Sequence, residues 1–231
     1  AGGRSVTIGD AQGLGTITND DAAVFTIRED ASGAEVGGPI TFTIDLSQPV
    51  DQATSVTVST ADGTALVGDS DYTPLAAQVV NFTAGQTTAT FQVLPTADGK
   101  VEGNETFTVS LGSVSGGYGS LSASATPRTG TITNDDAAAF TINDVSVSEG
   151  NAGQKSLVFT VTLSGAVDVA VSVDASTADG TATVADTDYQ AWGVTTLTFN
   201  PGGPLTQTVS VQVNGDTKVE ANETFTVNLT N

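Results

Sequence analysis

A nine-residue sequence, GTITNDDAA, occurs twice in this chain, at Gly15–Ala23 and again 115 residues later at Gly130–Ala138. Longer stretches recur in the same order. STADGTALVGDSDY at residues 59–72 returns as STADGTATVADTDY at 176–189, and KVEGNETFTVSL at 100–111 returns as KVEANETFTVNL at 218–229. A repeat of this length indicates two similar folding units in tandem, because each unit is long enough to bury a core of its own.

The apolar residues of the first unit lie in short runs that alternate with polar residues, many of them threonine. This period-two pattern, broken by clusters of Gly, Pro, Asp and Asn, is typical of antiparallel strands joined by turns. In ITFTIDL it predicts that Phe42, Ile44 and Leu46 point into the core. The chain is therefore predicted to be all-β, with two tandem antiparallel β-sandwiches. Seven strands are expected in the first unit: Ala23–Ile27, Ile40–Leu46, Ser55–Thr60, Gln78–Phe82, Thr87–Leu94, Thr106–Leu111 and Gly130–Thr133.

The two ends of the sequence read as one continuous unit. The second unit stops after ETFTVNLTN without a closing GTITNDD, and joining Asn231 to Ala1 produces a stretch that parallels residues 105–142. We therefore predict that residues 1–21 are the closing strand of a preceding domain and that residues 22–136 are a complete domain. Residues 137–231 are expected to be a domain completed by residues 1–21 of a neighbouring copy, either in a covalent array or by strand donation. The absence of an initiator methionine indicates a processed or excised piece.

Composition narrows the possible partners. Six basic residues against 26 acidic ones give a net charge of −20, so nucleic acid and anionic membranes are expected to be repelled, whereas cations are attracted. The chain has no His and no Cys, which removes the commonest general base and all thiolate metal sites. No apolar stretch is long enough to predict membrane insertion. The lack of Cys fits an exported bacterial protein.

The ordered motifs, DGTA followed by DY, then D-x-x-x-E-x-x-E-T-F and finally GTITNDD, resemble the Calx-beta family over nearly the whole chain. The resemblance implies immunoglobulin-like sandwiches that hold Ca²⁺ among carboxylates at the pole facing the next domain. Calcium takes six to eight hard oxygen ligands, so converging acidic loops suit it. Carried over by motif, the expected ligands are Glu29, Asp62, Asp98, Glu102, Asp135 and Asp136 in the first unit, and Glu149, Asp179, Asp216 and Glu220 in the second, with Asp20 and Asp21 of an adjoining copy.

The chain departs from the calcium-binding pattern of that family in two places. Only one aspartate, Asp98 or Asp216, stands where such members carry a pair, and Asn19 and Asn134 replace the first of three closing aspartates. Fewer charged ligands predict fewer ions or weaker binding, in the range of extracellular modules.

Other interpretations of these residues remain open. Asp and Asn are also ordinary turn formers, so DGTA and NDD can be explained without an ion, and Asp71 and Asp188 are expected to anchor turns. The Asp69 and Asp71 pair begins like an EF-hand loop, but the later ligand positions do not match. Trp192 is expected to pack in the core rather than form a sugar platform. Catalysis is not expected, because every acidic cluster recurs in both units, as a structural device would.

The sequence thus predicts an extracellular or cell-surface repeat module of bacterial origin that forms an elongated stalk or a head-to-tail filament, with calcium rigidifying its junctions. A calcium-sensing regulatory module and an adhesive domain that binds a glycan or receptor through its loops are the alternatives.

Overall fold

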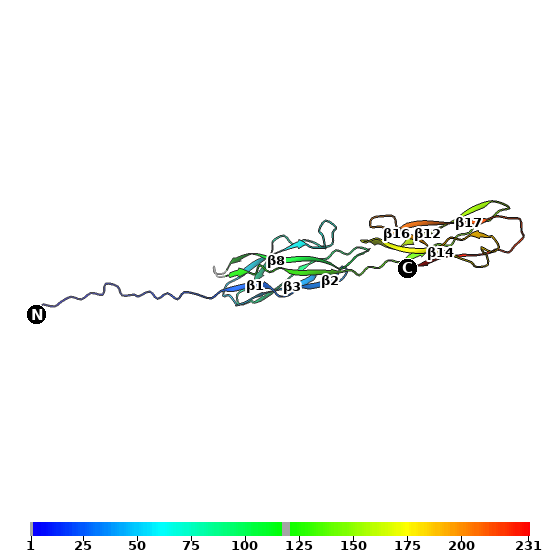
Figure 1. Ribbon diagram of the computed structural model, residues 1–231. Coiled ribbons are helices and arrows are strands. Elements are labelled where there is room, and N and C mark those ends of the chain that lie inside the picture. The colour runs from blue at the N-terminus through cyan, green and yellow to red at the C-terminus, as the bar shows by residue number, and fades with distance from the viewer. Residues whose placement is uncertain (1, 117–120) are drawn as a thin grey trace.

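The computed structural model describes residues 2–116 and 121–231; residue 1 of the expected closing strand and residues 117–120 of the first unit lie outside the described residues. The described strands form two β-sandwiches that lie end to end (Figure 1). No helix in the described part of the chain has the length and apolar character needed to cross a membrane.

The first sandwich consists of two sheets, and all seven strands expected from the sequence are present. One sheet has the order β6 (Thr88–Val93), β3 (Ile40–Leu46), β1 (Ala23–Ile27) and β9 (Leu121–Ala123). The other has the order β2 (Ala31–Ala34), β10 (Arg128–Thr133), β8 (Glu105–Gly116), β4 (Thr54–Asp62) and β5 (Gln78–Phe82).

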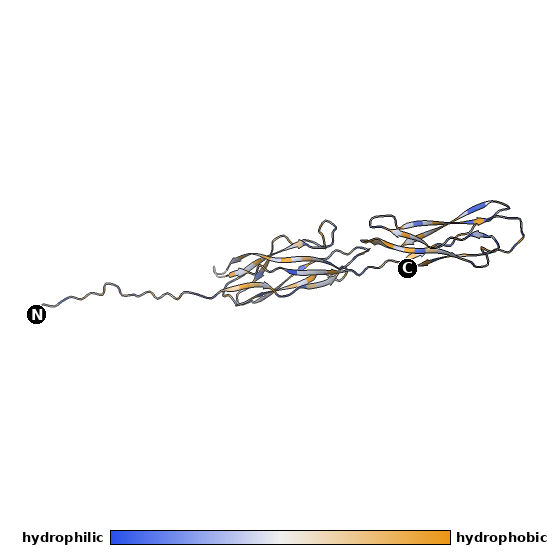
Figure 2. Ribbon diagram, viewed as in Figure 1, coloured by the Kyte–Doolittle hydropathy of each residue, from blue (hydrophilic) through white to orange (hydrophobic). Residues whose placement is uncertain are grey.

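Alternation along the strands builds the first core. Phe42, Ile44 and Leu46 of β3 are buried, as predicted, while Thr41 faces solvent. Figure 2 shows the same alternation as apolar and polar positions along the strands. The Phe42 and Phe91 rings of neighbouring strands stack with their centroids 5.2 Å apart, while the pairs Phe25–Phe82 and Phe42–Phe107 join the two sheets.

The second sandwich repeats most of this arrangement. One sheet has the order β11 (Phe140–Ile142), β12 (Gln154–Leu163), β17 (Thr206–Asn214) and β15 (Tyr189–Gln190), and the other β16 (Thr195–Phe199), β14 (Val171–Ala178) and β18 (Thr226–Thr230). Within residues 137–231, no strand corresponds to β2, β9 or β10. As a result β11 and β18 are each paired on one side only.

The two sandwiches contact one another through a short loop of the first. Its strand β7 (Lys100–Val101) pairs in parallel with β13 (Ala166–Val167) of the second sandwich. The Val101 side chain packs against the second core. The Gly103 N–H also donates a hydrogen bond to Asp168 Oδ2 at 3.3 Å. This contact makes the junction part of the folded structure.

Residues 2–22 form no strand, and all their side chains are exposed. The segment extends away from the first sandwich on the side opposite the second (Figure 1). It carries four large apolar side chains in this exposed state: Val6, Ile8, Leu14 and Ile17.

Packing in β10 explains the glycine of the repeated GTIT sequence. A Cβ added at Gly130 would overlap the ring of Phe107, which is fully buried on the neighbouring strand β8. The closing strand therefore needs glycine here so that the ring can lie flat against its backbone.

Gly130→Ala is expected to lower the free energy of unfolding of the first sandwich by about 1–3 kcal/mol, because the added methyl group overpacks the core. The measurement is urea unfolding followed by circular dichroism. Trp192, the single tryptophan, lies in the second sandwich and should report an unchanged transition there. Gly37→Ala is the matched control, since its Cβ would lie at an ordinary 3.6 Å from its neighbours. Equal stability of the two variants would contradict the packing argument.

Candidate metal centre

The repeated DGTA…DY motif closes a loop at the end of the first sandwich where acidic side chains gather, here called the acidic pole. Asp62 Oδ1 accepts hydrogen bonds from the Tyr72 hydroxyl at 2.7 Å and from the Val67 N–H at 3.3 Å. Burial, followed by the hydrogen bond to Asp62, raises the pKa of Tyr72 to about 12. A Cβ at Gly63 would overlap the backbone carbonyl of Thr106. The motif thus brings this loop against the start of β8, and Asp179 and Tyr189 form the same pair in the second sandwich at 2.6 Å.

A first group of carboxylates lies where β2 and β10 end. These strands run in parallel, so Glu35, which follows β2, lies close to Asp135 and Asp136, which follow β10. One carboxylate oxygen from each residue lies within 4.8 Å of the others. Glu35 is only 8% exposed. Asp136 Oδ2 is buried with no hydrogen-bond partner, the one such side-chain atom found in the described part of the chain.

A second group, formed by Asp71, Glu102 and Glu105, lies beside the first with the same spacing of carboxylate oxygens. A cavity of about 10 Å³ is lined by all three residues and also by Glu35 and Asp98. This volume is close to that of a single water-sized sphere. The second group therefore shares one small acidic space with Glu35 of the first group and with Asp98.

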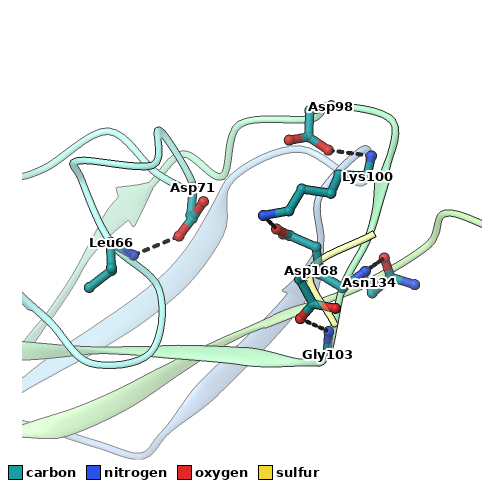
Figure 3. Close-up of polar contacts among 8 residues, drawn as sticks. Leu66, Asp71, Asp98, Lys100, Gly103, Asn134 and Asp168 are labelled. Carbon is teal, nitrogen blue, oxygen red and sulfur yellow. Dashed lines mark hydrogen bonds and ion pairs between the residues drawn. The ribbon is translucent and has the colours of Figure 1, made fainter. Parts of the chain in front are cut away.

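The loops that carry these carboxylates are tied together by hydrogen bonds. Asn134 Oδ1 accepts from the Glu102 N–H at 3.0 Å, and Asn134 Nδ2 donates to the Asp136 carbonyl at 2.9 Å. Lys100 Nζ forms an ion pair with Glu102 Oε1, and its backbone N–H donates to Asp98 Oδ1 at 2.7 Å. Figure 3 shows Asp71, Asp98 and Lys100 on neighbouring loops, with Asp168 of the second sandwich beside Gly103.

Burial and neighbouring charges alter the acidity of two members. Burial raises the pKa of Glu35 to about 7, and the surrounding carboxylates, Asp98 first among them, add to the effect. Burial also raises the pKa of Glu105 to about 7, together with the hydrogen bond that its protonated carboxyl donates to the Asp71 carboxylate. The ionised forms of both are costly without a compensating positive charge.

The second sandwich also has two groups, and one of them repeats the first sandwich. Asp188, Glu220 and Glu223 correspond to Asp71, Glu102 and Glu105. The other group is formed by Glu149, the counterpart of Glu35, with Asp216 and Glu220, so that Glu220 belongs to both. Lys218 pairs with Glu220 as Lys100 pairs with Glu102. Asp20 and Asp21, the expected ligands from an adjoining copy, lie exposed on the N-terminal segment.

The expected ligands fall into two sets in the structure. Seven lie in or beside the acidic groups: Asp98, Glu102, Asp135, Asp136, Glu149, Asp216 and Glu220. Asp62 and Asp179 each give an oxygen to a tyrosine hydroxyl. Glu29 is exposed in the turn between β1 and β2, outside the groups formed by the described carboxylates.

Five members of these groups were not expected as ligands: Glu35, Asp71, Glu105, Asp188 and Glu223. A closer comparison of the repeats contains the missing signal, because Glu149 lies seven residues after the end of its Phe-Thr-Ile strand, which is close to the eight residues for Glu35 and far from the two for Glu29. Asp71 does anchor a turn, since its Oδ2 accepts from the Leu66 N–H at 2.6 Å, and it also faces the acidic space. The two roles are compatible because a carboxylate has two oxygens.

Comparison with known proteins agrees with this architecture. A family model of the Calx-beta domain matches residues 18–144 and again residues 133–231. Among solved structures, the chain is similar to CBD12 from CALX1.2, with 21% identity and a TM-score of 0.44 over 90% of this chain and 79% of that chain. It is also similar to the apo-form Calx CBD1 domain, with 20% identity and a TM-score of 0.45 over 50% of this chain and 100% of that one. The comparison with curated proteins gave no match.

In metal-free buffer, the first sandwich is expected to lose stability as the pH rises from about 5 to 8. Glu35 has a pKa of about 7 when folded and an ordinary value of 4.5, so the folded state holds more protons across this window and the free energy of unfolding falls with pH. Thermal unfolding at several pH values measures the slope. Glu35→Gln should reduce the slope and leave the part due to Glu105, whereas Glu29→Gln, outside the groups, should leave it unchanged. An identical slope in all three proteins would contradict the expected acidity of Glu35.

Proposed function

Because the chain belongs to the Calx-beta domain family, we propose that it is a calcium-binding module whose ions are held by the carboxylate groups at the pole of each sandwich. In the first sandwich the ligands would come from Glu35, Asp98, Asp135 and Asp136 on one side and from Asp71, Glu102 and Glu105 on the other. In the second they would come from Glu149, Asp216 and Glu220, and from Asp188 and Glu223.

The observation that carries this proposal is the unpartnered oxygen of Asp136. A buried carboxylate oxygen without a hydrogen-bond donor is costly, and it lies in a group with the buried Glu35. Carboxylate oxygens converging from separate loops are the donors that Ca²⁺ prefers, and a divalent cation would supply the positive charge that Lys100 alone provides only in part. The residues present therefore fit the ion.

The position of the groups suggests what the ion would do. Glu102 belongs to an acidic group and directly follows β7, the strand that pairs with the second sandwich. Fixing Glu102 by an ion would also fix Val101 and Gly103, which contact that sandwich. Calcium would thereby stiffen the junction, and the module would serve as a unit of an elongated extracellular stalk or head-to-tail filament, a mechanical rather than a catalytic role.

A calcium-sensing regulatory module is the second candidate, and the same contact favours it. If binding changed the position of the loop at residues 98–105, the second sandwich would move with it through the pairing of β7 and β13.

A bacterial cell surface suits the stalk, since extracellular calcium is plentiful enough for sites with dissociation constants of about 10⁻⁴–10⁻³ M.

Calcium is expected to raise the melting temperature of the chain relative to EDTA, because an ion that binds only the folded state stabilises it by mass action. Isothermal titration calorimetry should give the affinity directly. Asp136→Asn should weaken the first site about tenfold, corresponding to about 1.4 kcal/mol.

Two aspartates of one loop provide a matched comparison. Asp71→Asn keeps an oxygen for the Leu66 N–H but removes a charge from the acidic space, so calcium affinity should fall. Asp62→Asn changes the loop anchor beside Tyr72 and should lower stability more than affinity. An unchanged melting temperature across millimolar calcium would exclude the proposed function.

The junction can be measured with spin labels, which the absence of native cysteine makes specific. Labels at Thr26→Cys and Ser210→Cys, both exposed, report the distance between the sandwiches. A distribution that narrows with calcium about an unchanged mean supports the stiffened stalk, whereas a shifted mean supports the sensor. Asp168→Ala should broaden the calcium-free distribution by removing the acceptor for Gly103. A distribution that calcium leaves unaltered would refute both roles.

A further inference from the structure

We propose that the second sandwich binds residues 6–18 of a second copy of this chain as two added strands, so that copies join head to tail. The docking rests on the structural role proposed above, but not on its calcium sites. It concerns the two strand edges that β11 and β18 leave open.

The first sandwich shows what occupies the equivalent edges. There β9 pairs in parallel with β1, and β10 pairs with β8, the strands to which β11 and β18 correspond. Edges with unpaired backbone N–H and C=O groups are templates for strand addition. The second sandwich therefore offers two such templates, one in each sheet.

The core of the second sandwich is correspondingly less covered beside β11 and β18. Phe107 and Phe25 are fully buried in the first sandwich, whereas their counterparts Phe225 and Phe140 are only half-buried. Val109 is buried, and its counterpart Val227 is half-buried. The exposure falls on the strands that lack neighbours, as missing strands would cause.

The N-terminal segment has the sequence that fits these places. The sequence VTI at residues 6–8 corresponds to LSA of β9, GTIT at 15–18 repeats part of β10, and six residues separate the two strands in both cases. By the register of the first sandwich, Val6 and Ile8 would lie beside Ala138 and Phe140. Ile17, now 99% exposed, would take the place of the buried Ile132.

Two local details support this match. Gly15 corresponds to Gly130, so it would leave room for the ring of Phe225 as Gly130 does for Phe107. Asn19 Nδ2 donates to the Asp21 carbonyl at 3.1 Å, the same turn that Asn134 makes with Asp136 at 2.9 Å. The end of the segment therefore already has the conformation that follows the closing strand.

The contact between two copies would also repeat the junction between the two sandwiches of one chain. Val101 packs against the core of the sandwich that follows it, whereas its counterpart Val219 is 99% exposed. In the docked copy, Val50 of the first sandwich corresponds to Val167 of β13 and would lie beside Val219. A docked copy would thus cover Val219 and would bring its Asp20 and Asp21 beside Glu149.

The segment cannot reach the second sandwich of its own molecule. Six residues separate Ile17 from Ala23, which allows a span of at most about 22 Å. The 12-residue strand β8 alone is about 40 Å long, and the site lies beyond the first sandwich. The segment of the same molecule is therefore excluded, whereas a second copy can supply it, and because such a contact is heterologous it propagates into a filament.

The direct test adds a synthetic peptide of residues 2–19 to the full chain in EDTA. The peptide ends before Asp20, so its binding does not depend on the acidic groups. We expect it to move the urea midpoint of Trp192 fluorescence, which reports on the second sandwich, to higher urea with increasing peptide concentration. Gly15→Val and Ile17→Asp peptides should have no effect, because one overlaps Phe225 and the other buries a charge. A Thr16→Ser peptide is the matched control and should act like the parent.

Sedimentation velocity of the full chain tests the assembly. Head-to-tail species should increase with concentration, and Gly15→Val or Val219→Asp in the full chain should reduce them while leaving circular dichroism unchanged. The free peptide should shorten the assemblies by occupying the site. A chain that stays monomeric and ignores the peptide would overturn the proposal, as would association that Gly15→Val does not affect. Loss of calcium binding with peptide binding intact would refute only the calcium function.

Discussion

The pairing of β10 with β8 is the interaction on which the rest of the first sandwich depends. It places Gly130 against the buried ring of Phe107 and Ile132 in the core, so it completes the packing between the sheets. The same strand pairs with β2 and thereby carries Asp135 and Asp136 to Glu35. Closure of the core and assembly of the acidic pole are thus one structural event. This explains why GTIT and NDD are adjacent in the sequence.

The acidic pole holds carboxylates whose negative charge is only partly compensated by neighbouring residues. Five carboxylates line one small cavity, Lys100 is paired with only one of them, Glu102, and Asp136 Oδ2 in the adjoining group has no hydrogen-bond donor. In a chain with a net charge of −20, such crowding is sustained because the loops that carry it are held by the backbone pairing and by Asn134. The pole also lies at the contact with the next sandwich, so neutralising it would affect the junction as well as the domain.

The second sandwich shows the consequence of separating the closing strand from its core. Phe225 and Phe140 keep their places but are half-buried, and the acidic groups retain their β8-type and loop residues without the two aspartates that follow β10 in the first sandwich. The strand that would supply both deficits has its sequence equivalent in the exposed N-terminal segment. A strand of that sequence would therefore add to both the packing of the core and the proposed calcium site.

The sequence by itself determined the elements and their order. Period-two alternation predicted β1, β3, β4, β5, β6, β8 and β10 of the first unit, but not β2, β7 or β9, and it predicted the inward side of β3, because alternate residues of a strand necessarily face opposite sides of a sheet. The repeat predicted two sandwiches because each unit is long enough to bury a core of its own. Only the tertiary structure decided which carboxylates meet. Glu29 and Glu35 both follow β1, and although the spacing of the repeats favours Glu35, it is the parallel pairing of β2 with β10 that brings Glu35 to the pole. Asp62 and Asp71 lie in one loop, yet Tyr72 takes an oxygen of Asp62 while Asp71 faces the acidic space. Proximity between residues distant in sequence arises from strand pairing, which no local pattern records.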